Sequence, residues 1–185
     1  DAEILREFTK ALLEHTRFAD LFLNEYQEIT LENANAHIQA QANFVLPLNR
    51  PYSEIFQGYN GNMRRKVKKL RQTKLQLFEN DSPDALIELF KQNKGGELKL
   101  EEDFYRQMKK AMYKLLHKGM GQVWTVYGGP NEMCAGCFWV RHKGRAVFLF
   151  SALNDWGKEY DAMPYLINEF IIYSSEKLDI LDFEG

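Results

Sequence analysis

Hydrophobic residues recur at the spacing of an amphipathic helix in three long stretches of the chain. These stretches are 1–15, 101–118 and 162–177. In the second stretch the expected buried face consists of Phe104, Tyr105, Met108, Ala111, Met112, Leu115 and Leu116. In the third stretch, Asp161 stands where a helix cap is expected. The pattern therefore predicts three helices that each bury one face.

Shorter signals predict three further helices. Residues 52–56 form a short candidate, and residues 60–73 form another that carries a basic run. A third begins at Ser82-Pro83, because serine is a favoured N-cap and proline fits the first helical position. It ends near the two glycines at 95–96.

Apolar runs between these helices predict strands. They lie at 18–23, 44–46, 75–78, 122–127, 133–140 and 146–151, and the last two form a hairpin. Both faces of the hairpin are apolar, with Ala135, Cys137 and Trp139 on one face and Cys134, Phe138 and Val140 on the other. Strands of this kind are central strands covered by helices on both sides. The sequence therefore predicts an α/β fold with a mixed sheet between helices.

The composition is that of a folded domain. The chain has 185 residues, of which 45% are hydrophobic and 14% aromatic, and its net charge is only −2. It has no apolar run of eighteen residues and no apolar leader, so we expect no membrane insertion, no export and a cytoplasmic location. It begins inside a helix without Met and stops just after a strand whose edge nothing covers, so we interpret it as a fragment.

The two cysteines form the sequence Cys134-Ala135-Gly136-Cys137. Such a pair can be a redox centre or half of a zinc site. A structural zinc needs four ligands, and the four histidines are scattered, so we predict no metal site. A redox pair is normally placed at a helix N-terminus, whereas this one lies in a strand pattern. We favour two buried, inert thiols, with a redox protein as the alternative.

A basic run stands out against the balanced charge. Seven of the eleven positions from 64 to 74 are Lys or Arg, which leaves about −9 on the rest of the chain (−2 minus 7). The run can grip phosphates of a nucleotide-linked substrate or of nucleic acid. The alternative is a solvated helix face with Val67 and Leu70 packed inward.

Two segments resemble the Fem-type branch of the GNAT acyltransferase superfamily. The first is the Tyr-x-x-Asn-x-Arg-Arg segment that begins at Tyr59, and the second is the ending Asp182-Phe183-Glu184-Gly185. The resemblance implies a mostly antiparallel sheet flanked by helices. It also implies that 1–81 is the C-terminal part of a first GNAT-like half, and that 82–185 is a second half without its last strands.

The same resemblance implies an N-acyltransferase. Its donor would be acyl-CoA or aminoacyl-tRNA, and its acceptor a small-molecule or peptidoglycan-precursor-like amine. The corresponding donor loop in GNAT enzymes is glycine-rich, whereas residues 151–161 contain one glycine and several acids. We interpret this stretch as a capped surface loop. The phosphate contacts that we predict are Arg64, Arg65, Lys68, Ser151, Asn154 and Lys158.

Acyl transfer to an amine needs a positioned carbonyl, a stabilised oxyanion and removal of a proton. In GNAT folds a splayed strand supplies backbone amides, and here that strand is 146–151. Tyr160 and Asp161 are the predicted proton handlers, with Glu169 as a further candidate. The candidate lining of an acceptor groove is Tyr52, Tyr59 and Trp139, each with core packing as the alternative.

The sequence contains no recognisable Ser-His-Asp or Cys-His set, so we predict direct transfer without a covalent enzyme intermediate. The competing hypothesis is a GNAT-shaped module that catalyses nothing and binds nucleic acid or a phosphorylated ligand through the basic helix.

Overall fold

A computed structural model describes residues 2–19, 21, 23, 39–129 and 132–184. The chain divides into two compact units, residues 1–41 and 42–185. In the first unit, helix α1 (Ala2–His15) confirms the predicted N-terminal helix.

The strand predicted over 18–23 is wrong as far as it is described. Residues 18, 19, 21 and 23 lie outside any strand, and 20 and 22 lie outside the described residues. A single strand leaves its backbone groups unpaired, and the described part of this unit contains no second strand to pair with. An apolar run alone therefore does not make a strand.

The second unit is built on a six-stranded sheet. Its strands are β1 (Val45–Pro47), β2 (Gln76–Glu79), β3 (Gly121–Gly128), β4 (Glu132–His142), β5 (Arg145–Leu153) and β6 (Ile180–Asp182). Their order across the sheet is β1-β6-β5-β4-β3-β2. Neighbours are antiparallel except β5 and β6, which run parallel. The predicted mixed, mostly antiparallel sheet is confirmed.

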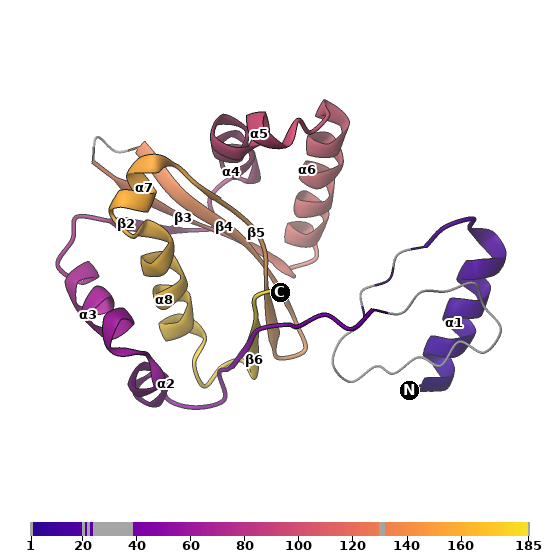
Figure 1. Cartoon of the computed structure of the whole chain (residues 1–185), viewed down its shortest axis with the longest axis horizontal. Helices are drawn as coiled ribbons and strands as arrows, with labels where there is room; N and C mark the ends of the chain where they lie inside the picture. Colours follow the sequence, from indigo (N-terminus) through magenta and orange to yellow (C-terminus); the bar gives the residue numbers. More distant parts are fainter. Residues whose placement is uncertain (1, 20, 22, 24–38, 130–131, 185) are drawn as a thin grey trace. The chain divides into compact units, whose positions relative to one another are not determined.

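Helices cover both faces of this sheet (Figure 1). One face carries α2 (Tyr52–Gly58), α3 (Gly61–Leu70) and α8 (Ala162–Ser174), and the other carries α4 (Pro83–Phe90) and α6 (Glu102–His117). Trp124, Trp139 and Phe170 lie in the core on the α8 side. Leu86, Tyr105 and Phe138 lie in the core on the α4 side. The prediction that β4 is a central strand covered on both faces is confirmed.

Local signals place two helix starts as predicted. The Ser82 hydroxyl accepts a hydrogen bond from the Asp84 N–H at 3.1 Å, and Pro83 follows it as the first helical residue. At the start of α3, the Asn60 side chain accepts from the Met63 N–H at 2.8 Å. Helix α4 continues through a π-helical turn, η1 (Lys91–Gly95), into α5 (Gly96–Leu98), so the helical stretch ends slightly later than predicted.

The predicted buried face of α6 needs a correction. Tyr105 and Met112 are buried, but Phe104 is 45% exposed and Ala111 is also exposed. The hydrophobic stripe of α6 is wider than the surface of α4 and β3 that covers it. A helical pattern indicates which side of a helix turns inward, but the width of the covered strip depends on its neighbours.

Cys134 lies on the opposite face of β4 from the one predicted. The register between β3 and β4 shifts at Val126 and Tyr127, which pair with Ala135 and Met133 and leave Cys134 in a bulge. Cys134 therefore belongs to the same core cluster as Ala135. Because a bulge inserts one residue, strict alternation along the sequence fails there.

The last strand is not an exposed edge, contrary to the expectation from the sequence. Strand β1 pairs with β6 on the side away from β5, with Leu46 opposite Leu181. The sheet thus takes strands from both sides of position 81. The assignment of 1–81 and 82–185 to two GNAT-like halves stays a prediction.

Candidate functional site

Strands β5 and β6 separate part of the way along β5. Arg145, Ala146 and Val147 pair with Ile180, Leu181 and Asp182. Strand β5 then continues to Leu153 and pairs with β4 alone. We call residues 148–153 the open segment, because none of the described strands occupies its second edge.

Asp182 holds the chain at the point where the two strands separate. Its carboxylate is buried, forms an ion pair with Arg145, and accepts from Asn43 Nδ2 at 2.9 Å. It also accepts from the Glu184 N–H at 3.0 Å. Burial alone would raise the pKa of Asp182, but the three hydrogen bonds lower it below its usual value.

The chain after β6 is directed toward β1 and away from β5. The Phe183 N–H donates to the carbonyl of Phe44 at 3.0 Å. Glu184 has a positive φ of 51°, which allows its N–H to turn back to Asp182. The separation of β5 and β6 therefore follows from specific contacts made by residues 182–184.

A bulge interrupts the open segment at Leu149. Phe148 pairs with Trp139 and Phe150 pairs with Phe138, so Leu149 has no partner on β4. Pairing with β6 has already ended at Val147. The Leu149 side chain is 51% exposed. Leu149 thus has no register partner in the described strands on either side, and bulges of this kind are frequent beside active sites.

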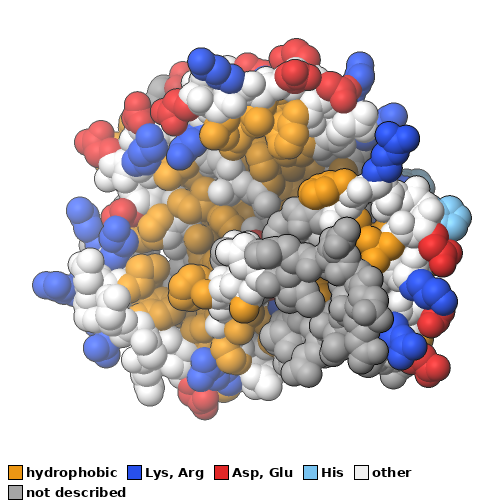
Figure 2. All heavy atoms as spheres, turned by 45° about the vertical axis from the view of Figure 1, so that its right-hand side comes forward, with side chains coloured by type: hydrophobic (Ala, Val, Ile, Leu, Met, Phe, Trp, Pro, Cys, Tyr) orange, Lys and Arg blue, Asp and Glu red, His pale blue; other side chains and the backbone are white. Residues whose placement is uncertain are grey.

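Aromatic side chains surround the open segment. Phe148 lies 6.2 Å from Phe183 between ring centroids, and Phe150 lies 4.8 Å from Phe90. On the face shown in Figure 2, hydrophobic side chains gather toward the middle and charged side chains lie mostly at the margin. Two side chains of the open segment, Phe148 and Phe150, therefore pack against other aromatic rings, while the second edge of the segment has no strand among those described.

The segment 151–161 is not the surface loop that the sequence predicted. Ser151 belongs to β5, and residues 155–159 form a short helix, α7 (Asp155–Glu159). Asn154 caps this helix by accepting from the Gly157 N–H at 2.7 Å. Lys158 forms an ion pair with Asp155 at 2.7 Å. The side chains of Asn154 and Lys158 are thus already engaged within α7.

Asp161 does not cap α8. Its backbone is left-handed, with φ of 56°, and its side chain makes no capping hydrogen bond. Its carboxylate instead accepts from Lys66 Nζ of α3 at 2.5 Å. The neighbouring Tyr160 stacks on Trp156, with ring centroids 4.2 Å apart and an interplanar angle of 19°. The predicted pair therefore lies beyond α7, next to the basic helix.

The basic helix presents its charges to solvent. Val67 and Leu70 are buried, as predicted for the inward face. Lys66 pairs with Asp161, whereas the other cations of the run are exposed and form no ion pair with any residue that the structure describes. These cations are Arg64, Arg65, Lys68, Lys69, Arg71 and Lys74. They are available to an anionic ligand.

The predicted acceptor-groove residues separate into two groups. The hydroxyls of Tyr52 and Tyr59 both donate to Asn168 Oδ1 of α8, at 2.8 and 3.4 Å. Burial, and secondarily Tyr52, raise the pKa of Tyr59. Trp139 does not line a groove, because it is fully buried and stacks on Phe170 at 3.7 Å. Glu169 follows Asn168 on α8 and is half-buried.

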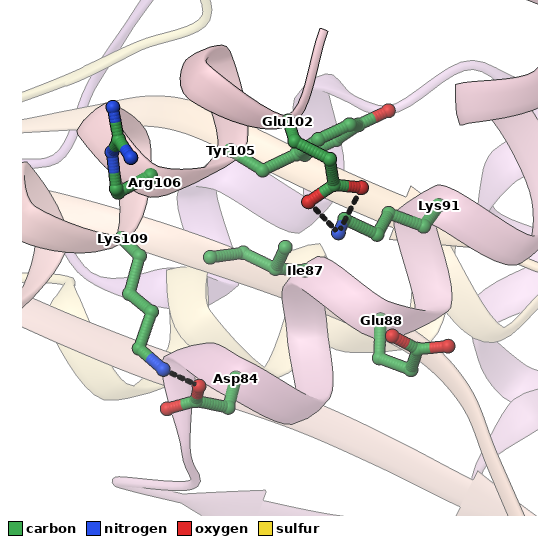
Figure 3. A pocket seen from close by; sticks show the side chains of 8 residues that line it. All are labelled: Asp84, Ile87, Glu88, Lys91, Glu102, Tyr105, Arg106 and Lys109. Carbon is green, nitrogen blue, oxygen red and sulfur yellow. Dashed lines mark hydrogen bonds and ion pairs between the residues drawn. The ribbon is translucent and has the colours of Figure 1, made fainter. Parts of the chain in front are cut away.

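Two pockets lie away from these residues. The first, of about 250 Å³, is lined by residues of α4, η1 and α6 (Figure 3). Four of its charged side chains form ion pairs with one another: Lys91 with Glu102 at 2.9 Å, and Lys109 with Asp84. The second, of about 400 Å³, lies at the end of β2 beside Tyr127. None of the site residues predicted from the sequence lines either pocket.

The described residues lack two other features. No group of three or more His, Cys, Asp or Glu side chains in the described part is arranged to hold a metal ion. None of the described helices is long and apolar enough to cross a membrane.

The fold and the open segment define a class of protein. The chain belongs to the GNAT acetyltransferase family, because residues 58–183 match the family described as acetyltransferase (GNAT) domain.

Among solved structures, FemX is similar, with a TM-score of 0.67 and 11% identity over 83% of this chain and 55% of that chain. A conserved protein of unknown function from Bacteroides thetaiotaomicron is similar at a TM-score of 0.48 and 14% identity, over 77% of this chain and 50% of that chain. No curated protein matches the sequence. This chain thus spans about half the length of both structures. At this identity the likeness to FemX shows the fold, which agrees with the Fem-type resemblance.

Sequence reasoning identified strand 146–151 but did not single out Leu149 or Asp182, which the structure places in the candidate site. A bulge leaves no mark in an apolar run, so nothing in the sequence pointed to Leu149. Asp182 was noted only as part of a family ending, although an acid within an apolar strand is a signal that it must find a partner.

Proposed function

We propose that the chain is part of an N-acyltransferase that moves an acetyl or aminoacyl group from an activated donor to an amine. One observation carries this proposal: the half-exposed bulge at Leu149, whose backbone lacks a strand partner on both sides in the described sheet. Membership of the GNAT family supports it.

The open segment supplies the first two requirements of acyl transfer. Its free edge can form main-chain hydrogen bonds with an extended donor, which positions the donor carbonyl. The Leu149 N–H can then donate to the oxyanion that forms when the amine attacks that carbonyl. As the new C–N bond forms, the amine loses a proton and the leaving thiol or hydroxyl takes one up.

Direct transfer fits the residues near the sheet. The two cysteines are buried, and burial raises the pKa of Cys134 to about 11 and that of Cys137 well above its usual value. A thiol in this state is a poor nucleophile. The proton-handling roles of Tyr160 and Asp161 stay predictions, because both residues lie beyond α7.

The finer identity of the substrates rests on the Fem-type resemblance. It favours acyl-CoA or aminoacyl-tRNA as donor, and a small-molecule or peptidoglycan-precursor-like amine as acceptor. The exposed cations of α3, among them Arg64, Arg65 and Lys68, support a substrate that carries phosphates.

The test uses the full-length protein that contains this chain. We expect Leu149→Pro, which removes the N–H, to lower transfer from acetyl-CoA or aminoacyl-tRNA by about 100-fold or more. Leu149→Ala keeps the amide and should retain transfer within a few-fold. Thermal melting of both variants separates lost chemistry from lost folding. Equal activity of a folded Leu149→Pro variant, or no transfer by the native protein, would refute the proposal.

A second candidate function is favoured by the unpaired charges of α3. In this hypothesis the domain binds nucleic acid and catalyses nothing. Binding would then weaken steeply with salt and be lost when Arg64, Arg65 and Lys68 become alanine. Binding that is absent, or that does not respond to salt, would exclude this function.

A further inference from the structure

The pocket at the end of β2 differs from the other pocket in the charge of its lining. It has a volume of about 400 Å³ and is lined by Phe78, Glu79, Asn80, Asp81 and Tyr127. We call it the acidic pocket, because this lining contains two acids and neither Lys nor Arg. Neither acid forms an ion pair with any residue that the structure describes. Their negative charge is therefore available to a ligand.

Two aromatic rings form the apolar part of the acidic pocket. The ring centroids of Phe78 and Tyr127 lie 5.0 Å apart, with an interplanar angle of 74°. Phe78 pairs with Thr125 across β2 and β3, so both rings lie on one face of the sheet. This face is the α4 side, because Val123 of the same alternation belongs to the core there. Phe78 is 45% exposed and Tyr127 is half-buried, so a ligand can reach both rings.

Hydrogen bonds hold the Asp81 carboxylate beside the rings. Its Oδ2 atom accepts from the hydroxyls of Thr125 and Tyr127, at 2.8 and 3.1 Å. Its Oδ1 atom accepts from the Ser82 N–H at 2.6 Å. A carboxylate can accept about four hydrogen bonds, two on each oxygen. Oδ1 can therefore accept a further donor, and the carboxylate is oriented before a ligand arrives.

The protein holds one of its own ammonium groups with the same kinds of group. In the pocket between α4 and α6, Lys91 Nζ lies 4.4 Å from the centroid of the Tyr105 ring (Figure 3). The same atom donates to both carboxylate oxygens of Glu102 at 2.9 Å. A ring face and a carboxylate together thus bind a primary ammonium. The acidic pocket combines these two kinds of group, and its lining contributes no ammonium of its own.

We propose that the acidic pocket binds the primary ammonium group of an alkylamine. The cation would lie against the Phe78 ring and donate to Asp81 Oδ1, while Glu79 adds negative charge. The inference goes beyond the proposed function and does not depend on it. Strands β4 and β3 lie between β5 and β2, which separates the pocket from the open segment by about 14 Å at the usual strand spacing. An amine in this pocket is therefore not the one that attacks a carbonyl at Leu149.

A metal ion fits the acidic pocket less well. A hard cation such as Ca²⁺ takes about six to eight oxygen ligands, whereas this lining offers two carboxylates. The search for groups of three or more metal-binding side chains found none among the described residues. The aromatic rings have a role in binding an organic cation and none in binding a metal ion.

The experiment titrates the full-length protein that contains this chain with two amines and follows binding by saturation-transfer NMR. n-Butylamine represents a free amine, and Nα-acetyl-lysine amide represents the lysine side chain of a polypeptide. We expect at least one of them to bind, and n-butanol, which lacks the charge, not to bind. Phe78→Leu should weaken binding about 3-fold, because it keeps apolar bulk but removes the ring. Asp81→Asn should weaken it about 5-fold.

Matched controls come from exposed positions outside the pocket. Phe104 has the same exposed fraction as Phe78, and Glu54 and Glu101 are exposed acids. Phe104→Leu and E54Q/E101Q should leave binding unchanged. Thermal melting shows whether each variant is folded. Tighter binding of the blocked lysine would assign the pocket to a lysine of a partner polypeptide, and tighter binding of n-butylamine would assign it to a free amine.

The inference is overturned if neither amine binds, or if n-butanol binds as tightly as n-butylamine. It is also overturned if the controls weaken binding as much as the folded Phe78 and Asp81 variants do. Displacement of the amine by an equal concentration of Ca²⁺ would indicate a metal site instead. None of these measurements involves acyl transfer, so failure of the proposed function would leave the amine pocket standing.

Discussion

The first three residues of β5 and the six that follow differ in what occupies their edges. Residues 145–147 are paired on both sides, and the ion pair between Arg145 and Asp182 fixes them to β6. The open segment is paired with β4 alone and contains a bulge. The closed part therefore satisfies its backbone within the protein, while the open segment keeps donors and acceptors for something else. One strand thus divides into a part paired on both sides and a part with an open edge.

The largest loss of stability that we expect comes from removing the buried side chain of Trp139, which supports both parts of β5. Trp139 is fully buried, stacks on Phe170 and lies 5.1 Å from Phe148 between ring centroids. Trp139→Ala should lower the free energy of unfolding by about 3–5 kcal/mol, because it leaves a cavity under the start of the open segment. Denaturant unfolding measures this loss. A loss below about 1 kcal/mol would show that Trp139 is not the support.

A smaller loss of stability should follow from breaking the ion pair between Arg145 and Asp182, which fixes residues 145–147 to β6. Asp182→Asn removes the buried charge that Arg145 faces, and it should cost about 2–3 kcal/mol at pH 7. Because the pKa of Asp182 is lowered in the folded protein, its contribution is complete at neutral pH. That contribution is lost as the pH falls through the folded pKa, below the ordinary value of 3.8.

The stability of the Asn variant should therefore lack this acid-dependent part. Unfolding measured between pH 2.5 and 7 checks the prediction, with Asp179→Asn, an exposed residue close in sequence, as the control. Parallel pH curves for the native protein and the Asp182 variant would contradict it.

Phe183 lies where the two parts meet, and its half-buried ring faces Phe148. Phe183→Ala should cost about 1–2 kcal/mol, less than a fully buried ring would. Hydrogen exchange should show the change locally, as faster exchange of the Val147 and Phe148 amides. Phe78→Ala at the opposite edge of the sheet should leave those amides unchanged. Uniform acceleration across the sheet would mean that Phe183 has only a global effect.

The effect that is smallest at neutral pH concerns the thiol of Cys134, which lies in the core on the α8 side of the sheet. The folded pKa of Cys134 is about 11, so the unfolded thiol ionises first as the pH rises above its ordinary value. The stabilising contribution is thus complete below about pH 9 and is lost between that value and pH 11, by at most about 1.4 kcal/mol per pH unit.

Cys134→Ala should flatten the alkaline side of the stability curve. Native Cys134 and Cys137 should also react with a thiol reagent only after unfolding. Rapid reaction of the folded protein would contradict both expectations and revive the redox hypothesis.

Sequence reasoning succeeded where the determining contacts are local. Ser82 and Asn60 cap helices through residues two and three positions away, so the sequence contains both partners. The inward face of α3 was also predictable, since Val67 and Leu70 are its apolar residues among charges. Apolar residues on both faces of a strand correctly predicted a central strand at β4.

It failed where the partner is distant in sequence. Asp161 looked like a cap, but its partner is Lys66 of α3, 95 residues earlier in the chain. Leu149 and Cys134 are bulged because of how β5, β4 and β3 pair, and pairing register is not visible in one strand. The phosphate contacts predicted at Asn154 and Lys158 ignored the short helix that engages both side chains.

The pairing of β1 with β6 has a consequence for how the protein is made. Val45 lies opposite Asp182, so the two strands are separated by nearly the whole of the second unit. During synthesis β1 leaves the ribosome long before its partner exists, and closing so long a loop is a slow step. The closed end of β5 can therefore form only after β6 has been synthesised, so the point at which β5 and β6 separate is completed late in the folding of this unit.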